Sequence, residues 1–343
     1  MHSYILMKAI TTPFIPDELQ QYWDAEAKVA HAAYALYSVA DIAQAMPPLL
    51  RPRDQHGAAY AVLPAAHDTQ PSHAIVVPLP FASDWGPSAA VRMGLLRALL
   101  PNAPQIIVFP NNSVRVPDVY RLDTRARQQV ACGDFAPVAA AQLRTLHELG
   151  VTTVQYFGYS QGASVSAAAL RLLAEPAYAH ISVGPSGLFA MPNVVRRATW
   201  QVARDFMADI GSLQHTIKAS ALPALNEIRC LRGSRDAAAW AADFIQSSRN
   251  ITLPVNSTLR AGFGYPTFWE DFTTALQTHG TVITAGAGSD DRMVPPSAFA
   301  TLEHLAATHQ NLRILRVSGQ GHSMADNVVA HALLGKALFG PHS

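Results

Sequence analysis

The chain has 343 residues, of which 49% are hydrophobic and 14% charged, and its formal net charge is +1. This composition excludes an extensively disordered chain and is typical of an ordered protein with a sizeable core. The balanced charge gives no electrostatic reason to expect nucleic acid or an anionic membrane as a partner. The two cysteines, Cys132 and Cys230, are not in a metal-binding spacing, so we expect two free thiols rather than a disulfide framework.

The N-terminal region predicts neither export nor membrane insertion. It lacks the basic region, apolar run and small-residue cleavage site of a signal peptide, and no stretch of 18 or more apolar residues predicts a spanning helix. We therefore expect a soluble, cytoplasmic protein. Residues 1–70 are predicted to form an extension with one helix, over Asp17–Met46, between Pro16 and Pro47. A weaker strand signal follows over Ala58–Ala66.

From residue 71 onward, strand-like and helix-like segments alternate along the chain. The strand-like segments are continuous apolar runs, which favours a mostly parallel, doubly wound α/β sheet with helices on both faces. We predict strands over Ala74–Leu79, Gln105–Phe109, Thr152–Phe157, Ile181–Val183, Thr281–Ala285 and Leu312–Val317. We predict helices over Ser88–Leu100, from the cap at Asp134 to Gly150, over Ser160–Ala174, and over Pro296–Thr308.

The alternation is interrupted between residues 188 and 277, where the sequence is mostly helical in character and rich in aromatic residues. An insertion at this position predicts a helical cap over the carboxyl edge of the sheet. We therefore expect an N-terminal extension (1–70), an α/β core (71–187 and 278–343) and a cap (188–277).

The clearest chemical signal is the segment Gly-Tyr-Ser-Gln-Gly from Gly158 to Gly162, after a predicted strand and at the start of a predicted helix. This GxSxG pattern in a strand–turn–helix context is typical of a nucleophilic serine, because the strained turn requires small flanking residues. The N–H groups and positive dipole end at a helix start also stabilise a developing oxyanion. We predict that Ser160 is the nucleophile.

A serine hydroxyl needs a general base, and His322 is the predicted base. It follows the last predicted strand, within Ser-Gly-Gln-Gly-His-Ser, so its loop is expected at the same edge of the sheet as Ser160. Two adjacent carboxylates, Asp290 and Asp291, follow the strand before it, and only one of them can orient the base. Spacing alone does not choose between the two.

The order Ser160, carboxylate, His322, with each residue after a strand, resembles the α/β-hydrolase superfamily. The most specific pieces are the segments GYSQG, DDRMVPP and GQGHS, and the resemblance extends from about residue 72 to the C-terminus, apart from the cap. It implies the α/β-hydrolase fold, and it implies Asp291 rather than Asp290 as the catalytic acid.

The resemblance also implies an oxyanion hole made of two backbone N–H groups. The first belongs to Gln161, directly after the nucleophile, and the second to Phe81, in the loop after the strand over Ala74–Leu79. The sequence departs from the family here, because Leu79-Pro80 replaces the usual His-Gly before Phe81. Ala82 is the alternative donor if the loop is shifted.

The resemblance implies an esterase- or lipase-like serine hydrolase that acts through an acyl-enzyme on Ser160, with no metal or organic cofactor. The aromatic-rich cap favours a small-molecule acyl substrate of apolar character, and we predict carboxylic-ester cleavage. Thioester, amide and carbon–carbon cleavage on the same triad remain alternatives, as does a non-catalytic ligand receptor on this fold. The elbow also resembles that of cutinases, but the long insertion and the isolated cysteines argue against a close relationship. Residues 1–70 remain open as a partner surface or homo-oligomer contact.

Overall fold

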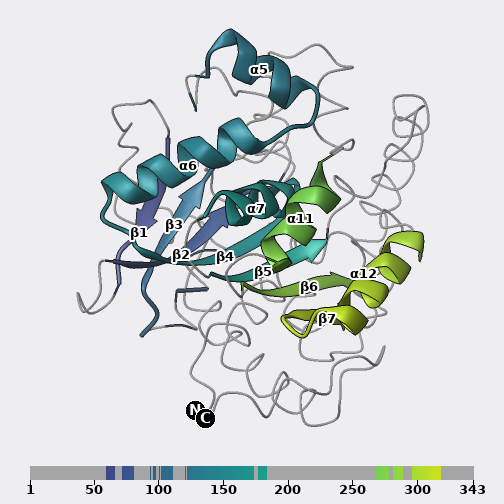
Figure 1. Cartoon of the computed structure of the whole chain (residues 1–343). Helices are drawn as coiled ribbons and strands as arrows, with labels where there is room; N and C mark the ends of the chain where they lie inside the picture. The colour runs from purple at the N-terminus through teal and green to yellow at the C-terminus, as the bar shows by residue number, and fades with distance from the viewer. Residues whose placement is uncertain are drawn as a thin grey trace, which may run out of the picture.

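The structure is a computed structural model that describes residues 59–65, 72–80, 93, 96–97, 100, 102–110, 120, 122–173, 177–183, 267–277, 281–288 and 296–317 (Figure 1). The strands are β1 (Ala61–Leu63), β2 (His73–Pro78), β3 (Gln105–Phe109), β4 (Thr153–Ser160), β5 (Tyr178–Val183), β6 (Val282–Gly288) and β7 (Leu312–Val317). The helices are α5 (Thr124–Ala131), α6 (Ala136–Glu148), α7 (Gln161–Leu172), α11 (Phe268–Gln277) and α12 (Pro296–Thr308).

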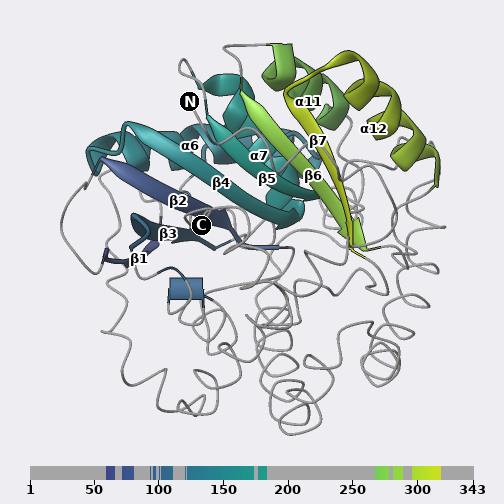
Figure 2. The same cartoon turned by 90° about the horizontal axis from the view of Figure 1, so that it is seen from below.

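The described strands form one seven-stranded sheet in the order β1-β3-β2-β4-β5-β6-β7. Strand β1 pairs antiparallel with β3, and the other pairings among these strands are parallel. The crossovers from β3 to β4 and onward to β7 step in one direction, so the right-handed crossover rule puts their helices on one face. Figure 2 shows α6, α7 and α11 together on one side of the sheet. The predicted mostly parallel sheet with helices is therefore confirmed.

Both faces of the central strands are buried. Val76 of β2 and Ile107 of β3 belong to the core cluster formed with α6 and α7. Their neighbours Ile75 and Ile106 point to the opposite face, because side chains alternate along a strand, and they are equally inaccessible at 0% exposure. The doubly wound arrangement stays a prediction, since the helix over Ser88–Leu100 is described only in part.

Helix α6 is terminated by the turn at Gly150 as the sequence predicts, but its N-cap is Phe135, one residue after the predicted cap Asp134. Asp134 Oδ1 accepts a hydrogen bond from the N–H of the first helical residue (3.0 Å). At the other end Gly150 has a φ of 73°, and its N–H donates to His147 O (3.0 Å). The N–H of Val151 donates to Leu146 O (2.9 Å), which completes a Schellman motif. The turn that follows sends the chain directly into β4.

Helix α11 packs against α7, beside it in the helical layer (Figures 1 and 2). Arg171 Nε of α7 forms an ion pair with Asp271 Oδ1, and Asp271 is 1% exposed. Thr267 Oγ1 donates to the second oxygen of this carboxylate (3.3 Å). These contacts put residues 268–277 in the layer that covers the sheet, although the sequence interpretation assigned them to the end of the cap. An amphipathic helix with aromatic residues can pack in a cap or on the sheet, so its sequence pattern does not show which of the two it belongs to.

The predicted N-terminal helix and residues 188–266 of the predicted cap lie outside the described residues, so both stay predictions. In the described part of the chain, none of the helices combines the length and apolarity that crossing a bilayer requires.

Candidate active site

Ser160 is the last residue of β4 and directly precedes α7. Its φ is 52° and its ψ is −124°, and it is the one non-glycine residue with positive φ in the described part of the chain. Such a conformation is unfavourable for a residue with a Cβ and persists only where the surroundings enforce it, often at functional sites. The strained turn predicted from GxSxG is therefore present in the structure.

The two glycines of this turn are required by close packing. A Cβ on Gly162 would lie 2.2 Å from the backbone oxygen of Pro78, and a Cβ on Gly158 would lie 2.3 Å from Ser166 Oγ and 2.7 Å from Gly162 O. Real Cβ atoms essentially never approach within 3.0 Å of such atoms. A side chain at either position would therefore displace the strand or the helix that holds Ser160.

The end of β2 lies beside the start of α7, as the close approach of its last carbonyl to Gly162 shows. The N–H of Leu79 donates to Phe109 O (2.9 Å), so the pairing with β3 continues one residue beyond β2. Gln161 is the first residue of α7 and is 0% exposed, and its N–H belongs to the helix end that stabilises negative charge. The second predicted oxyanion donor, Phe81, lies outside the described residues.

The strands that lead to the predicted acid and base end at the level of the GxSxG turn. Parallel pairing aligns Tyr159, through β5, with Gly286 of β6, and Gly286 with Leu315 of β7. Asp291 and His322 come a few residues after these two positions, at the carboxyl edge where α/β sheets bind ligands. Both lie outside the described residues, so the structure brings the strand ends together while the triad itself stays a prediction.

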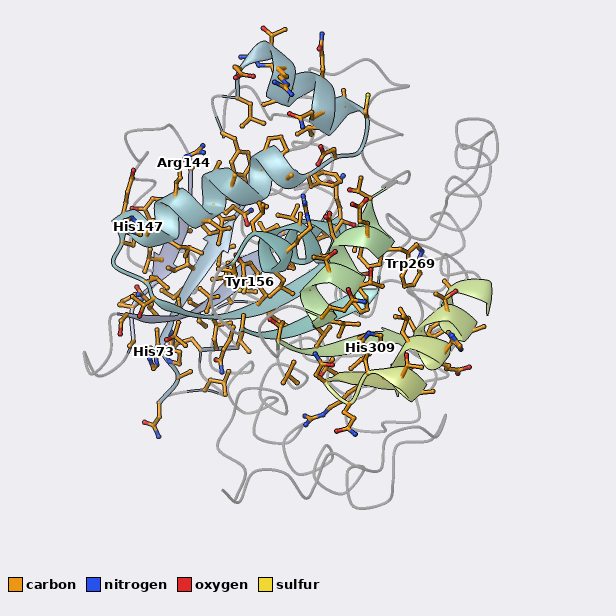
Figure 3. All side chains as sticks on the ribbon, viewed as in Figure 1. His73, Arg144, His147, Tyr156, Trp269 and His309 are labelled. Carbon is orange, nitrogen blue, oxygen red and sulfur yellow. The ribbon has the colours of Figure 1, made fainter. Side chains whose placement is uncertain are left out.

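A buried polar cluster that the sequence did not predict lies on the helix side of the sheet. Tyr120 donates its hydroxyl hydrogen to Pro110 O (2.8 Å) and accepts from Gln142 Nε2 (3.0 Å). Tyr156 of β4, labelled in Figure 3, is fully buried, and burial raises its pKa, with a smaller contribution from Tyr120. The cluster ties the end of β3 to α6. In the sequence, this cluster appears only as polar residues within apolar segments, and that pattern does not show that they contact one another.

The described residues contain no group of three or more His, Cys, Asp or Glu that could hold a metal ion.

Several solved structures are similar to this chain. A bromoperoxidase from Bacillus anthracis matches with a TM-score of 0.51 at 14% identity, over 82% of this chain and 94% of that chain. A carboxylesterase of the thaumarchaeon Nitrososphaera gargenis has a TM-score of 0.49 at 12% identity, over 79% and 88% of the two chains. MenH from S. aureus has a TM-score of 0.49 at 15% identity, over 81% and 97%.

No family model matches the sequence, and no curated protein matches it either. The chain has the α/β-hydrolase fold, as its motifs implied, and the bromoperoxidase match carries this conclusion. An identity of 14% shows the fold alone, so the activity has to be inferred from the residues of the turn and from the strand ends around it.

Proposed function

We propose that the protein is a serine hydrolase that cleaves a carboxylic ester through an acyl-enzyme on Ser160. The observation that carries this proposal is the backbone of Ser160, which has a φ of 52° between a strand and a helix. The glycines on either side leave no room for a Cβ, so the turn is held tightly around the serine. A hydroxyl presented in this way at a helix start is suited to attack on an acyl carbonyl.

In the proposed mechanism, His322 removes the proton from Ser160 Oγ as this oxygen attacks the acyl carbonyl. Asp291 orients the imidazole and stabilises its charged form. The oxyanion of the tetrahedral intermediate accepts hydrogen bonds from the backbone N–H groups of Gln161 and Phe81. Collapse expels the alcohol, which takes the proton from His322. Water, activated by the same histidine, then releases the acid and restores Ser160.

This assignment is supported by the sheet register, because β6 and β7 run parallel to β4 in the same sheet and their carboxyl ends lie at the edge where β4 delivers Ser160, beyond the intervening β5. We propose that the loops after β6 and β7 carry Asp291 and His322 along this edge toward the serine. We propose an apolar acyl substrate on the strength of the aromatic residues in the predicted cap, such as Trp200, Phe206 and Trp240.

The test is covalent labelling of the folded, full-length protein with a fluorescent fluorophosphonate, beside hydrolysis of p-nitrophenyl acetate, butyrate and octanoate. We expect wild type to label and to turn over these esters, and Ser160→Ala to lose at least about 10³-fold of both activities. Ser164→Ala is the control, since Ser164 is a fully buried serine four residues further along the chain, within α7. It should label at the wild-type rate.

Two outcomes would count against the proposal. Folded wild type that neither labels nor hydrolyses any of the esters would argue for a ligand receptor on the same fold. Equal labelling of wild type and Ser160→Ala would place the reactive nucleophile elsewhere. The trend from acetate to octanoate measures how much of the acyl chain the pocket accepts.

A further inference from the structure

Ser166 lies in α7 with its side chain 0% exposed. Its hydroxyl donates to Gly162 O at 2.9 Å, the carbonyl four residues earlier in the helix. Ser166 Oγ also lies so close to Gly158 that a Cβ on Gly158 would be 2.3 Å from it. One hydroxyl therefore contacts both glycines of the GxSxG turn, one on the strand side and one on the helix side.

A serine inside a helix often bonds to the carbonyl of the preceding turn, and that bond alone has no functional meaning. The contact with Gly158 distinguishes Ser166, because it joins β4 to the first turn of α7 across the strained residue. Ser160 keeps its positive φ only as long as the two arms of the turn are held in place. The oxygen of Ser166 fills the space between these arms.

We propose that Ser166 is a positioning residue for the nucleophile, and this proposal rests on the proposed function of Ser160. Its hydroxyl sets the spacing between β4 and α7 and thereby the direction of Ser160 Oγ. Since Ser166 is fully buried and its hydroxyl lies against Gly158 and Gly162, we expect it not to touch substrate, so its removal should lower kcat and leave KM unchanged. A substitution that merely unfolded part of the protein would also lower kcat per total enzyme at constant KM, so the labelling rate constant, which does not depend on the active fraction, separates the two cases.

The first experiment compares wild type, Ser166→Ala and the control Ser164→Ala well below the unfolding temperature of each. Alanine has the highest helix propensity, and Gly162 O keeps its intrahelical N–H donor, so Ser166→Ala should fold. We expect its labelling rate and its kcat for p-nitrophenyl butyrate to fall by about 3- to 10-fold, with KM unchanged. Ser164→Ala should stay within about two-fold of wild type. Wild-type kcat in Ser166→Ala, or an equal loss in Ser164→Ala, would overturn the proposal.

The second experiment is a double-mutant cycle with Gly158→Ala, which places a Cβ against Ser166 Oγ. We expect Gly158→Ala to reduce the labelling rate less in the Ser166→Ala background than in wild type, because the oxygen it meets is gone. The rescue should be partial, since Gly162 O would still lie 2.7 Å from the new Cβ. Strictly additive effects would refute the contact.

The two proposals fail in different ways. Absence of labelling in folded wild type refutes the activity of Ser160 and the role of Ser166 with it. Labelling of wild type and Ser166→Ala at equal rates refutes only the role of Ser166.

Discussion

Strand β4 lies between two turns in which one residue adopts a positive φ, and the two turns are built differently. At the amino end, Gly150 has a φ of 73°, and nothing lies within 4 Å of the position its Cβ would take. At the carboxyl end, the residue with positive φ is Ser160, at 52°, and the glycines lie two residues before and after it, at Gly158 and Gly162. The positive φ of Ser160 is unfavourable for a residue with a Cβ, and the space at Gly158 and Gly162 is too small for a side chain.

The two turns show two reasons why a chain has glycine at a position: a positive φ, or close packing that leaves no room for a Cβ. Gly150 relieves backbone strain where the chain leaves α6, whereas Gly158 and Gly162 permit close approach of the strand, the helix and β2. A turn shaped by stability alone would place a glycine at position 160. Keeping a hydroxyl there instead lowers stability and holds a reactive group rigidly, as is common at functional sites.

Among substitutions that keep Ser160, the largest effect is expected for Gly162→Ala. The new Cβ would meet the carbonyl oxygen of Pro78, a backbone atom that cannot move without shifting β2. We expect the fluorophosphonate labelling rate to fall by at least about 100-fold, because small displacements of a nucleophile are costly to rate. Labelling kinetics and thermal unfolding of the purified variant measure the two consequences separately.

Gly150→Ala is the control for that substitution. It strains a positive φ in open space, so it should lower the free energy of unfolding by about 1 kcal/mol and leave labelling intact. A loss of labelling as large as that of Gly162→Ala would show that the two turns do not differ in the way described.

A smaller effect separates two substitutions at Ser160 itself. Ser160→Gly and Ser160→Ala should both abolish labelling, but only glycine adopts the positive φ without strain. We expect the glycine variant to have a free energy of unfolding higher by about 1 kcal/mol than the alanine variant. Urea denaturation of both proteins measures this difference, and a less stable glycine variant would contradict the strain at this position.

The smallest effect concerns Tyr156, between the two turns on β4. Burial raises the pKa of its phenol above the ordinary value of 10.0, so the folded state favours the protonated form. The resulting stability is fully present below about pH 10 and is lost as the pH rises toward the folded-state pKa. Wild type should therefore lose stability above about pH 10 more steeply than Tyr156→Phe, as measured by urea denaturation across this range. Parallel curves for the two proteins would indicate that the phenol is not buried in solution.

Elements with sharp local ends could be predicted from the sequence. The bounds of β3, β7 and α12 are those expected, and β3 shows why, since Pro104 and Pro110 enclose a short apolar run. Strand β4 is longer than predicted, because Gly158 looked like the start of the turn, whereas the strand continues to Ser160. The elbow itself was predictable because its requirements lie within five consecutive residues.

Features that depend on distant residues could not be predicted. Helix α5 has a largely polar sequence, so periodicity missed it, although Asp123 caps it through the N–H of Ala126 (2.8 Å). No local pattern indicates that α11 packs on α7, or that Ser166 contacts Gly158. The roles of Asp291, His322 and Phe81 remain predictions for a related reason, since they depend on loops outside the described residues.

We expect a newly synthesised chain to build much of this sheet in chain order. Strands β4, β5, β6 and β7 are neighbours in the same order as in the chain, so each can dock on the previous one as it leaves the ribosome. The turn around Ser160 is held by β2, β4 and α7 and by β5, which pairs with Ser160, and all of these are made before β6 and β7. The strands that carry the predicted acid and base emerge last. We therefore expect the nascent protein to hold a formed but inert nucleophile, and to become active only when translation is nearly complete.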